Sequence, residues 1–97
     1  MSKKSKEKKC NALMDMFSLL SNEIRFKTLC LLSEGDYCVN DIVKDVNGKP
    51  SNVSQQLKML TVAGYVSRRR EGKRVYYHLE DSQIKKVITF LHDVFDN

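Results

Sequence analysis

Apolar side chains recur along this chain in two different periods, and the period changes near residue 65. Before that point, apolar positions return every three or four residues, which is typical of amphipathic helices. After it, Val75, Tyr77 and Leu79 alternate with polar or aromatic neighbours, as in a strand with one buried face. The helical period then returns from Ile84. The pattern therefore predicts a mainly α protein with one small β-hairpin.

Four helices are predicted ahead of the hairpin. They run from about Cys10 to Leu20, from near Glu23 to Gly35, from Asn40 or Asp41 through Val46, and from Pro50 to Ala63-Gly64. Ser21 and Asn22 are both suitable N-caps for the second helix. Pro50 suits the first position of a helix, where its missing N–H has no partner to lose. The residues expected on the buried face of the fourth helix are Val53, Leu57, Leu60 and Val62.

The hairpin is expected from Tyr65 to Leu79, with its turn at Glu71-Gly72. A last helix then begins near Asp81 or Ser82 and has the clearest period in the chain. A helix–turn–helix followed directly by a hairpin is a winged helix, here in the order α-α-α-α-β-β-α. Residues 10–97 are accordingly predicted to be one winged-helix DNA-binding and dimerisation domain, and residues 1–9 a disordered basic tail.

Charge and composition restrict the class of protein. The 97 residues carry a formal net charge of +5, concentrated in the lysine-rich start and in the hairpin. This segregation is typical of a protein with one end that binds a polyanion. No apolar run reaches the roughly 20 residues that span a bilayer, so we expect a cytoplasmic protein without a membrane partner. With two histidines and no phosphate-cradling glycine loop, the chain is predicted to be no enzyme and to need no cofactor.

The fourth helix and the hairpin together offer the two kinds of group that sequence-specific DNA binding requires. The polar residues expected to contact base edges are Ser51, Asn52, Ser54, Gln55 and Gln56. The cations expected to contact phosphates are Lys58, Arg68, Arg69, Arg70, Lys73 and Arg74. Which of the hairpin cations face the DNA depends on the strand register, which the sequence leaves open. We predict a regulator that binds double-stranded operator DNA.

The first and last helices keep apolar faces that the DNA-binding core does not use. A chain of this size has a modest core, so packing these faces against a second subunit is favourable. The expected result is a homodimer that presents two recognition helices to a palindromic site.

Three segments of the chain resemble the ArsR/SmtB family of bacterial winged-helix repressors. LLSNEIRFKTLCLLSEGDYCVNDIV is similar to the family's "L-x-x-x-x-R-x-x-I-L-x-L-L" helix followed by "E-x-x-V-x-D-I". SNVSQQLKMLTVAGYV resembles the recognition-helix pattern "S-x-V-S-x-H-L-x-x-L-x-x-A-G-L-V", and RRREGKRVYYHL the wing pattern "x-R-R-x-G-R-x-x-Y-Y-x-L". The resemblance implies a homodimer through the first and last helices, which represses a small operon until an inducer weakens DNA binding. It also leaves open an antirepressor mode, in which the protein activates by displacing another DNA-bound protein.

The metal-sensing sites of this family are incomplete here. Where the soft-metal branch has Cys-Val-Cys-Asp, this chain has Cys38-Val39-Asn40-Asp41 and so one thiolate fewer. Asp81 matches a ligand of the zinc branch, but Gln83 stands where a histidine is expected. The polar residues near the end of the chain, among them His92 and Asp96, do not match the remaining spacing. We therefore assign no metal ligand, and a metal- or metalloid-responsive repressor stays the alternative.

Among the branches of this family, the thiol-based branch has the cysteine positions most similar to those of this chain. The segment TLCLL around Cys30 resembles the sequence around the first cysteine of that branch. Phe95-Asp96 occupies the region where the branch has its second cysteine. Cys10 is a candidate substitute, so Cys10 and Cys30 are the predicted thiol switch, responding to an oxidant or to reactive sulfur. In the alternative interpretation Cys30 is a small buried apolar residue.

Overall fold

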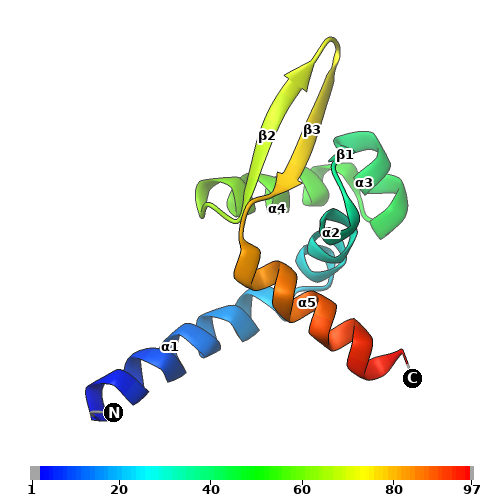
Figure 1. The fold of residues 1–97 in the computed structure, drawn as a ribbon. Helices are drawn as coiled ribbons and strands as arrows, with labels where there is room; N and C mark the ends of the chain where they lie inside the picture. Colours follow the sequence, from blue (N-terminus) through cyan, green and yellow to red (C-terminus); the bar gives the residue numbers. More distant parts are fainter. Residues whose placement is uncertain (1–2, 97) are drawn as a thin grey trace.

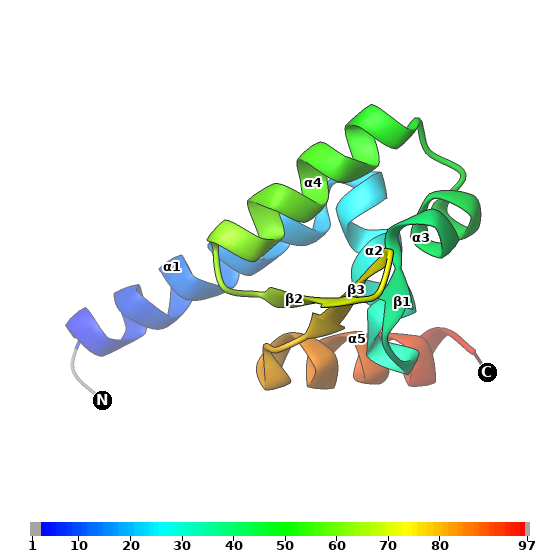
Figure 2. The same cartoon turned by 90° about the horizontal axis from the view of Figure 1, so that it is seen from above.

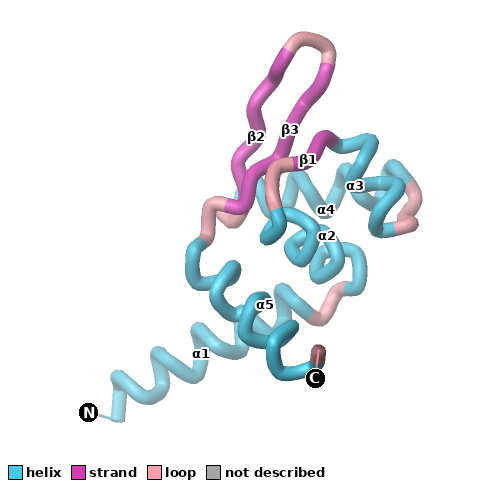
Figure 3. Tube along the Cα trace, turned by 45° about the vertical axis from the view of Figure 1, so that its right-hand side comes forward, coloured by secondary structure: helices cyan, strands magenta, loops and turns pink. Residues whose placement is uncertain are grey.

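The computed structural model describes residues 3–96. Within that range the elements are α1 (Lys3–Leu20), α2 (Glu23–Glu34), β1 (Tyr37–Cys38), α3 (Val39–Val46), α4 (Pro50–Val62), β2 (Val66–Glu71), β3 (Arg74–Leu79) and α5 (Ser82–Phe95). The hairpin β2–β3 projects from one end of the molecule, and α1 and α5 lie at the other end (Figure 1). Viewed along the hairpin, α4 and α5 lie to opposite sides of it (Figure 2). Short turns connect most of the elements (Figure 3).

Helix α2 lies at the centre and contacts α1, α3, α4, α5 and β3. Its buried residues Leu29, Leu31 and Leu32 pack with side chains from all of these elements. The largest fully buried apolar side chains are Leu29, Ile42, Val46, Val53, Leu57, Leu60, Ile84 and Ile88. Each of them contributes roughly 1.5–3 kcal/mol by leaving water. This core fixes α4 and the base of the hairpin relative to each other.

The helix boundaries show which capping predictions hold. The side chain of Asn22 accepts a hydrogen bond from the Arg25 backbone N–H at 3.0 Å, so Asn22 rather than Ser21 caps α2. Helix α4 starts with Pro50 in its first turn, as predicted. The prediction that Asn40 or Asp41 caps α3 is wrong, because this helix already begins at Val39, directly after β1.

The turn between α3 and α4 depends on its two small or adaptable residues. Asn47 ends α3 in the left-handed conformation with φ of 53°, which Asn tolerates better than most residues. A Cβ on Gly48 would lie 2.9 Å from the Ile24 Cδ1 and 2.9 Å from the Val53 Cγ2. Gly48 thus allows the turn to approach α2 and α4 closely.

The sheet has three strands in the order β1-β3-β2, one more than the hairpin predicted from the sequence. The extra strand lies in Tyr37-Cys38-Val39, which the sequence predicts to be a short extended segment without assigning it to the sheet. In the structure Tyr37 pairs with Tyr77 and Cys38 with Tyr76. A strand of two residues is too short to show a period of two, so its pairing left no pattern in the sequence. In the hairpin, Glu71 pairs with Arg74, which moves the predicted turn by one residue to Gly72-Lys73. Gly72 has φ of 62°, which glycine adopts without strain.

Two further boundaries differ from expectation. Residues 1–9 were expected to form a disordered tail, but helix α1 begins at Lys3 and includes residues 3–9; residues 1 and 2 lie outside the described residues. Lysine and glutamate have good helix propensity, and no glycine or proline interrupts this segment. Val62 was expected on the buried face of α4 but is 81% exposed. It follows the fully buried Leu60 by two residues, and two helical steps of about 100° turn a side chain to the opposite face.

Candidate nucleic-acid interface

Helix α4 has one buried face and one exposed polar face. Val53, Leu57 and Leu60 are fully buried and hold the helix against α2 and the hairpin. The predicted base-reading residues that are exposed are Ser51, Asn52, Ser54 and Gln55. Four short hydrogen-bonding side chains on the first turns of an accessible helix match the groups that read base edges in the major groove. The fifth predicted residue, Gln56, is only half-exposed and bonds within the protein.

Arg68 and Lys58 lie around a groove between α4 and the hairpin. The groove has a volume of about 530 Å³ and is lined by Ser54, Lys58, Thr61, Val62, Arg68 and Tyr77. Because Arg68 pairs with Tyr77 and Arg69 with Tyr76, the alternation of the strands separates the two arginines. The register that the sequence left open thus places Arg68 beside the exposed polar face of α4. We call this side of the hairpin, with Arg68 and Lys58, the groove face.

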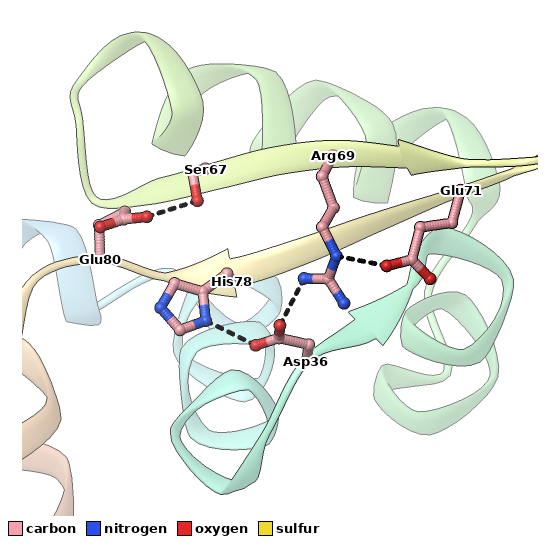
Figure 4. Close-up of polar contacts among 6 residues, drawn as sticks. All are labelled: Asp36, Ser67, Arg69, Glu71, His78 and Glu80. Carbon is pink, nitrogen blue, oxygen red and sulfur yellow. Dashed lines mark hydrogen bonds and ion pairs between the residues drawn. The ribbon is translucent and has the colours of Figure 1, made fainter.

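Arg69 lies on the other side of the hairpin and is bound by carboxylates (Figure 4). Its Nη1 lies 2.5 Å from the Asp36 Oδ2, and its Nε lies 2.8 Å from the Glu71 Oε1. The guanidinium also lies 5.2 Å from the centre of the Tyr76 ring. The other Asp36 oxygen, Oδ1, lies 2.6 Å from the His78 Nδ1. Asp36, Arg69, Glu71 and His78 therefore form a polar cluster, which we call the wing clamp.

The wing clamp ties both long strands to the segment before β1. The hydrogen bond between Asp36 and His78, and to a smaller extent the one from Arg69, lowers the pKa of the Asp36 carboxyl. The two carboxylates correspondingly raise the pKa of Arg69, so this cation is already paired. A further hydrogen bond of 2.6 Å runs from the Ser67 hydroxyl to the Glu80 Oε1 at the base of the hairpin (Figure 4).

The remaining hairpin cations are Arg70, Lys73 and Arg74, all exposed near the tip. Arg70 donates from Nε to the Gly72 carbonyl oxygen at 3.2 Å. The tip of the hairpin therefore carries a cluster of exposed positive charges.

Sequence reasoning did not identify two residues that arrange this surface. Asp36 is 33 positions from Arg69, and Arg25, which donates to Gln56, is 31 positions from it. Asp36 lies in no local pattern, and Arg25 is the arginine of the quoted family helix pattern, which does not indicate its partner. Each contact forms only through the tertiary fold.

The three cysteines have different environments. Cys10 is exposed on α1, Cys30 is partly buried on α2, and Cys38 is buried, with its thiol donating to the Asp41 Oδ2 at 3.2 Å. Burial, and secondarily the charge of Glu34, raises the pKa of the Cys30 thiol. This shift lowers the thiolate fraction of Cys30 at neutral pH.

The residues weighed as metal ligands do not converge. Within residues 3–96 no group of three or more His, Cys, Asp or Glu side chains is placed to hold a metal ion. Asp81 instead caps α5 and accepts from the backbone N–H groups of Gln83 at 2.9 Å and Ile84 at 3.0 Å. In the same range no helix is long and apolar enough to cross a bilayer.

Comparison with known proteins identifies the family. The family described as bacterial regulatory protein, arsR family, matches residues 22–68, the segment from the cap of α2 to Arg68. The solved structure of Rv0081 from Mycobacterium tuberculosis is 31% identical, with a TM-score of 0.75, over 89% of this chain and 87% of that one. The chain belongs to the arsR family. It is thus a DNA-binding transcriptional regulator and not an enzyme, as the sequence predicted.

Two relatives of this arsR-family regulator bear on its action. The biofilm growth-associated repressor of Xylella fastidiosa is 27% identical over 98% of this chain and 83% of its own length. Its crystal structure superposes with a TM-score of 0.86, which confirms the winged-helix fold. The transcriptional activator HlyU of Vibrio cholerae is 28% identical over 92% of this chain and 82% of its own length.

Proposed function

We propose that the protein is a transcriptional repressor that binds a palindromic operator through α4 and the groove face of the hairpin. The observation that carries this proposal is the position of Lys58 and Arg68 around one groove beside the exposed polar residues of α4. Base-reading and phosphate-binding groups on one continuous surface are what a sequence-specific DNA-binding module needs. The similarity to a named repressor supports the direction of regulation.

Docking places α4 in the major groove with Ser51, Asn52, Ser54 and Gln55 toward base edges. Lys58 and Arg68 then contact phosphates at the wall of the same groove. The hairpin tip, with Lys73 and Arg74, extends along the duplex toward the neighbouring backbone or minor groove. Arg69 contributes to the orientation of the hairpin because the wing clamp holds it.

The homodimer is proposed from the apolar surface of α1 and α5. The exposed large apolar side chains of these two helices are Leu13, Met14, Phe17, Phe90, Val94 and Phe95. Phe17 is 71% and Phe95 81% exposed, which is a high cost in water for aromatic rings. A second copy covers these faces and presents a second α4 to the other half of a palindrome.

The test begins with selection of bound duplexes from a random-sequence library, followed by fluorescence anisotropy on the selected duplex and on a scrambled one. We expect a palindromic motif and binding at least about 100-fold tighter to it than to the scrambled duplex. Equal binding to both duplexes would contradict the proposal.

The dimer is tested with Phe17→Asp combined with Phe90→Asp, measured by sedimentation. We expect a monomer that binds the selected duplex far more weakly, because each half-site is then bound alone. The matched control, Asn40→Asp, adds a carboxylate to an exposed position of α3 and should remain dimeric. A dimeric double variant would place the interface elsewhere.

For the inducer we propose oxidation of Cys10 and Cys30, the two cysteines with exposed surface. Diamide accepts the two hydrogens that leave as two thiols form a disulfide, and the new bond pulls on α1 and α2. The raised pKa of Cys30 makes this reaction slow at neutral pH and faster as pH rises. We expect diamide or polysulfide to weaken DNA binding, and Cys30→Ser or Cys10→Ser to abolish that effect. Equal binding by reduced and treated protein would exclude the thiol switch.

The similarity to a named activator favours a second candidate, an antirepressor that activates by displacing another DNA-bound protein. Transcription from the selected site with purified polymerase separates the two. A repressor lowers transcription in this minimal system, whereas an antirepressor has no effect until the competing protein is added.

A further inference from the structure

We infer that Arg25, through Gln56, sets the orientation of Asn52 on the recognition helix, so that Asn52 offers its amide N–H groups to DNA. This inference rests on the proposed function and deepens it, because it specifies which hydrogen-bonding group one position of α4 presents to a base. Arg25 touches no base in this arrangement and is a positioning residue.

The Arg25 guanidinium is fixed from two sides. Its Nε donates to the Leu19 carbonyl oxygen at 2.9 Å, and its Nη2 donates to the Ser18 carbonyl oxygen at 3.1 Å. Both carbonyls belong to the last turn of α1, where helical C=O groups lack partners within the helix. The remaining nitrogen, Nη1, donates to the Gln56 Oε1 at 3.1 Å and lies 3.8 Å from the Met59 sulfur. One planar side chain thus connects the end of α1 to α4.

The chemistry of these groups determines the direction of every hydrogen bond that follows. A guanidinium has donors and no acceptor, so the carbonyl oxygen of the Gln56 amide must point toward Arg25. The Gln56 Nε2 therefore points along the helix and donates to the Asn52 Oδ1 at 3.3 Å. Since that contact requires an acceptor, Asn52 turns its oxygen inward and its NH₂ group toward the exposed surface.

This relay changes what the two amides can read. A bidentate contact with adenine needs both the oxygen and the nitrogen of one amide, and the Gln56 oxygen is occupied. Gln56 is therefore unavailable for the direct contact expected from the sequence. Asn52 presents donors, which pair with acceptors on the base edge: O6 and N7 of guanine, N7 of adenine or O4 of thymine.

The decisive variant is Gln56→Glu. A carboxylate still accepts from Arg25 but cannot donate to Asn52, so the Asn52 amide turns over and presents its oxygen to the DNA. Duplex selection with this variant should change the preference at one position per half-site, toward cytosine or adenine, whose exocyclic amino groups donate in the major groove. We expect a change of about tenfold or more in relative occupancy at that position. Gln55→Glu is the matched control, because it adds the same charge to α4 outside the relay. Since Gln55 is itself a proposed base-reading residue, this control should change the motif only at the position that Gln55 reads.

A motif for Gln56→Glu that matches the wild-type motif at every position would overturn the inference. So would a change that Gln55→Glu reproduces at the same position. A loss of affinity for all sequences in both variants reflects the added charge. It does not affect the base preference at single positions, which is compared within the motif of each variant.

A measurement without DNA separates failure of the relay from failure of the proposed function. In two-dimensional NMR spectra of the whole protein, Arg25→Lys should shift the side-chain amide signals of both Gln56 and Asn52. Unchanged signals would contradict the relay even if the protein binds DNA. Shifted signals in a protein that selects no motif would instead retain the relay and reject the proposed operator recognition.

Discussion

The two faces of the hairpin carry neighbouring arginines with opposite surroundings. On the groove face, Arg68 of β2 and Lys58 of α4 line one groove. On the opposite face, Arg69 is paired with Asp36 and Glu71 and lies over Tyr76. The two residues are adjacent in sequence and identical in type, so composition alone assigns them the same role. The alternation of a strand, together with what each face packs against, leaves Arg68 open for the proposed phosphate contact and places Arg69 in the wing clamp.

The face of the hairpin that carries Arg69 also holds the hairpin in position. The wing clamp joins β2 and β3 to the segment before β1 by charged hydrogen bonds (Figure 4). A hairpin is marginal without further packing, so contacts at its base fix its angle to α4. The groove face then keeps its cations available because the clamp uses Arg69 for this structural purpose.

The largest effect is expected on the groove face. Lys58→Ala combined with Arg68→Ala removes two phosphate contacts from each protomer, four from the proposed dimer, and should weaken DNA binding about hundredfold or more near 0.15 M salt. The slope of log affinity against log salt should become shallower by about 3.6, which is 0.9 for each of the four lost contacts. Anisotropy titrations over a range of salt concentrations measure both quantities. An unchanged slope would remove the groove face from the interface.

Arg69→Ala is expected to weaken DNA binding less than the double variant does, and also to lower the stability of the fold. Because its charge is already paired, its loss should leave the salt slope nearly unchanged and reduce affinity by only a few-fold, on the order of a surface ion pair. The thermal midpoint should fall slightly in calorimetry as the hairpin loses its clamp. A slope that decreases as much as in Arg68→Ala would show that the two faces do not differ.

The smallest effect is the pH dependence of the wing clamp. The pKa of Asp36 is lowered in the folded protein, so the unfolded chain binds this proton more readily. Its contribution to the free energy of unfolding is therefore present above the ordinary carboxyl pKa, near 3.9, and lost as pH falls through the lower folded value. Asp36→Asn should be less stable than wild type at pH 5 and approach it toward pH 2. A difference independent of pH in urea unfolding would contradict this assignment.

Much of the fold follows from the sequence because hydrophobic period and turn chemistry are local. Pro50, the turn at Asn47-Gly48 and the alternation through Tyr77 and Leu79 mark their elements without reference to the rest of the chain. The segment of β1 was expected to be extended, but its place in the sheet was not predicted, because two residues carry no period and tertiary pairing supplies the partner strand.

The site was predicted less completely, for the same reason. Residue type identified the polar face of α4 and the cations of the hairpin, but it could not separate Arg68 from Arg69 or Gln55 from Gln56. Those distinctions depend on Asp36 and Arg25, which lie far away in sequence and come into contact only when the chain folds.

The most direct test of the proposed DNA-binding surface is an NMR titration of the protein with the selected duplex. We predict that the largest amide shifts fall in α4 and along the groove face of the hairpin, from Arg68 to the tip, while the signals of Asp36 and of the α1 and α5 surfaces stay nearly in place. Shifts concentrated on α1 and α5, with α4 unaffected, would contradict the claim that the recognition helix and the wing together bind DNA.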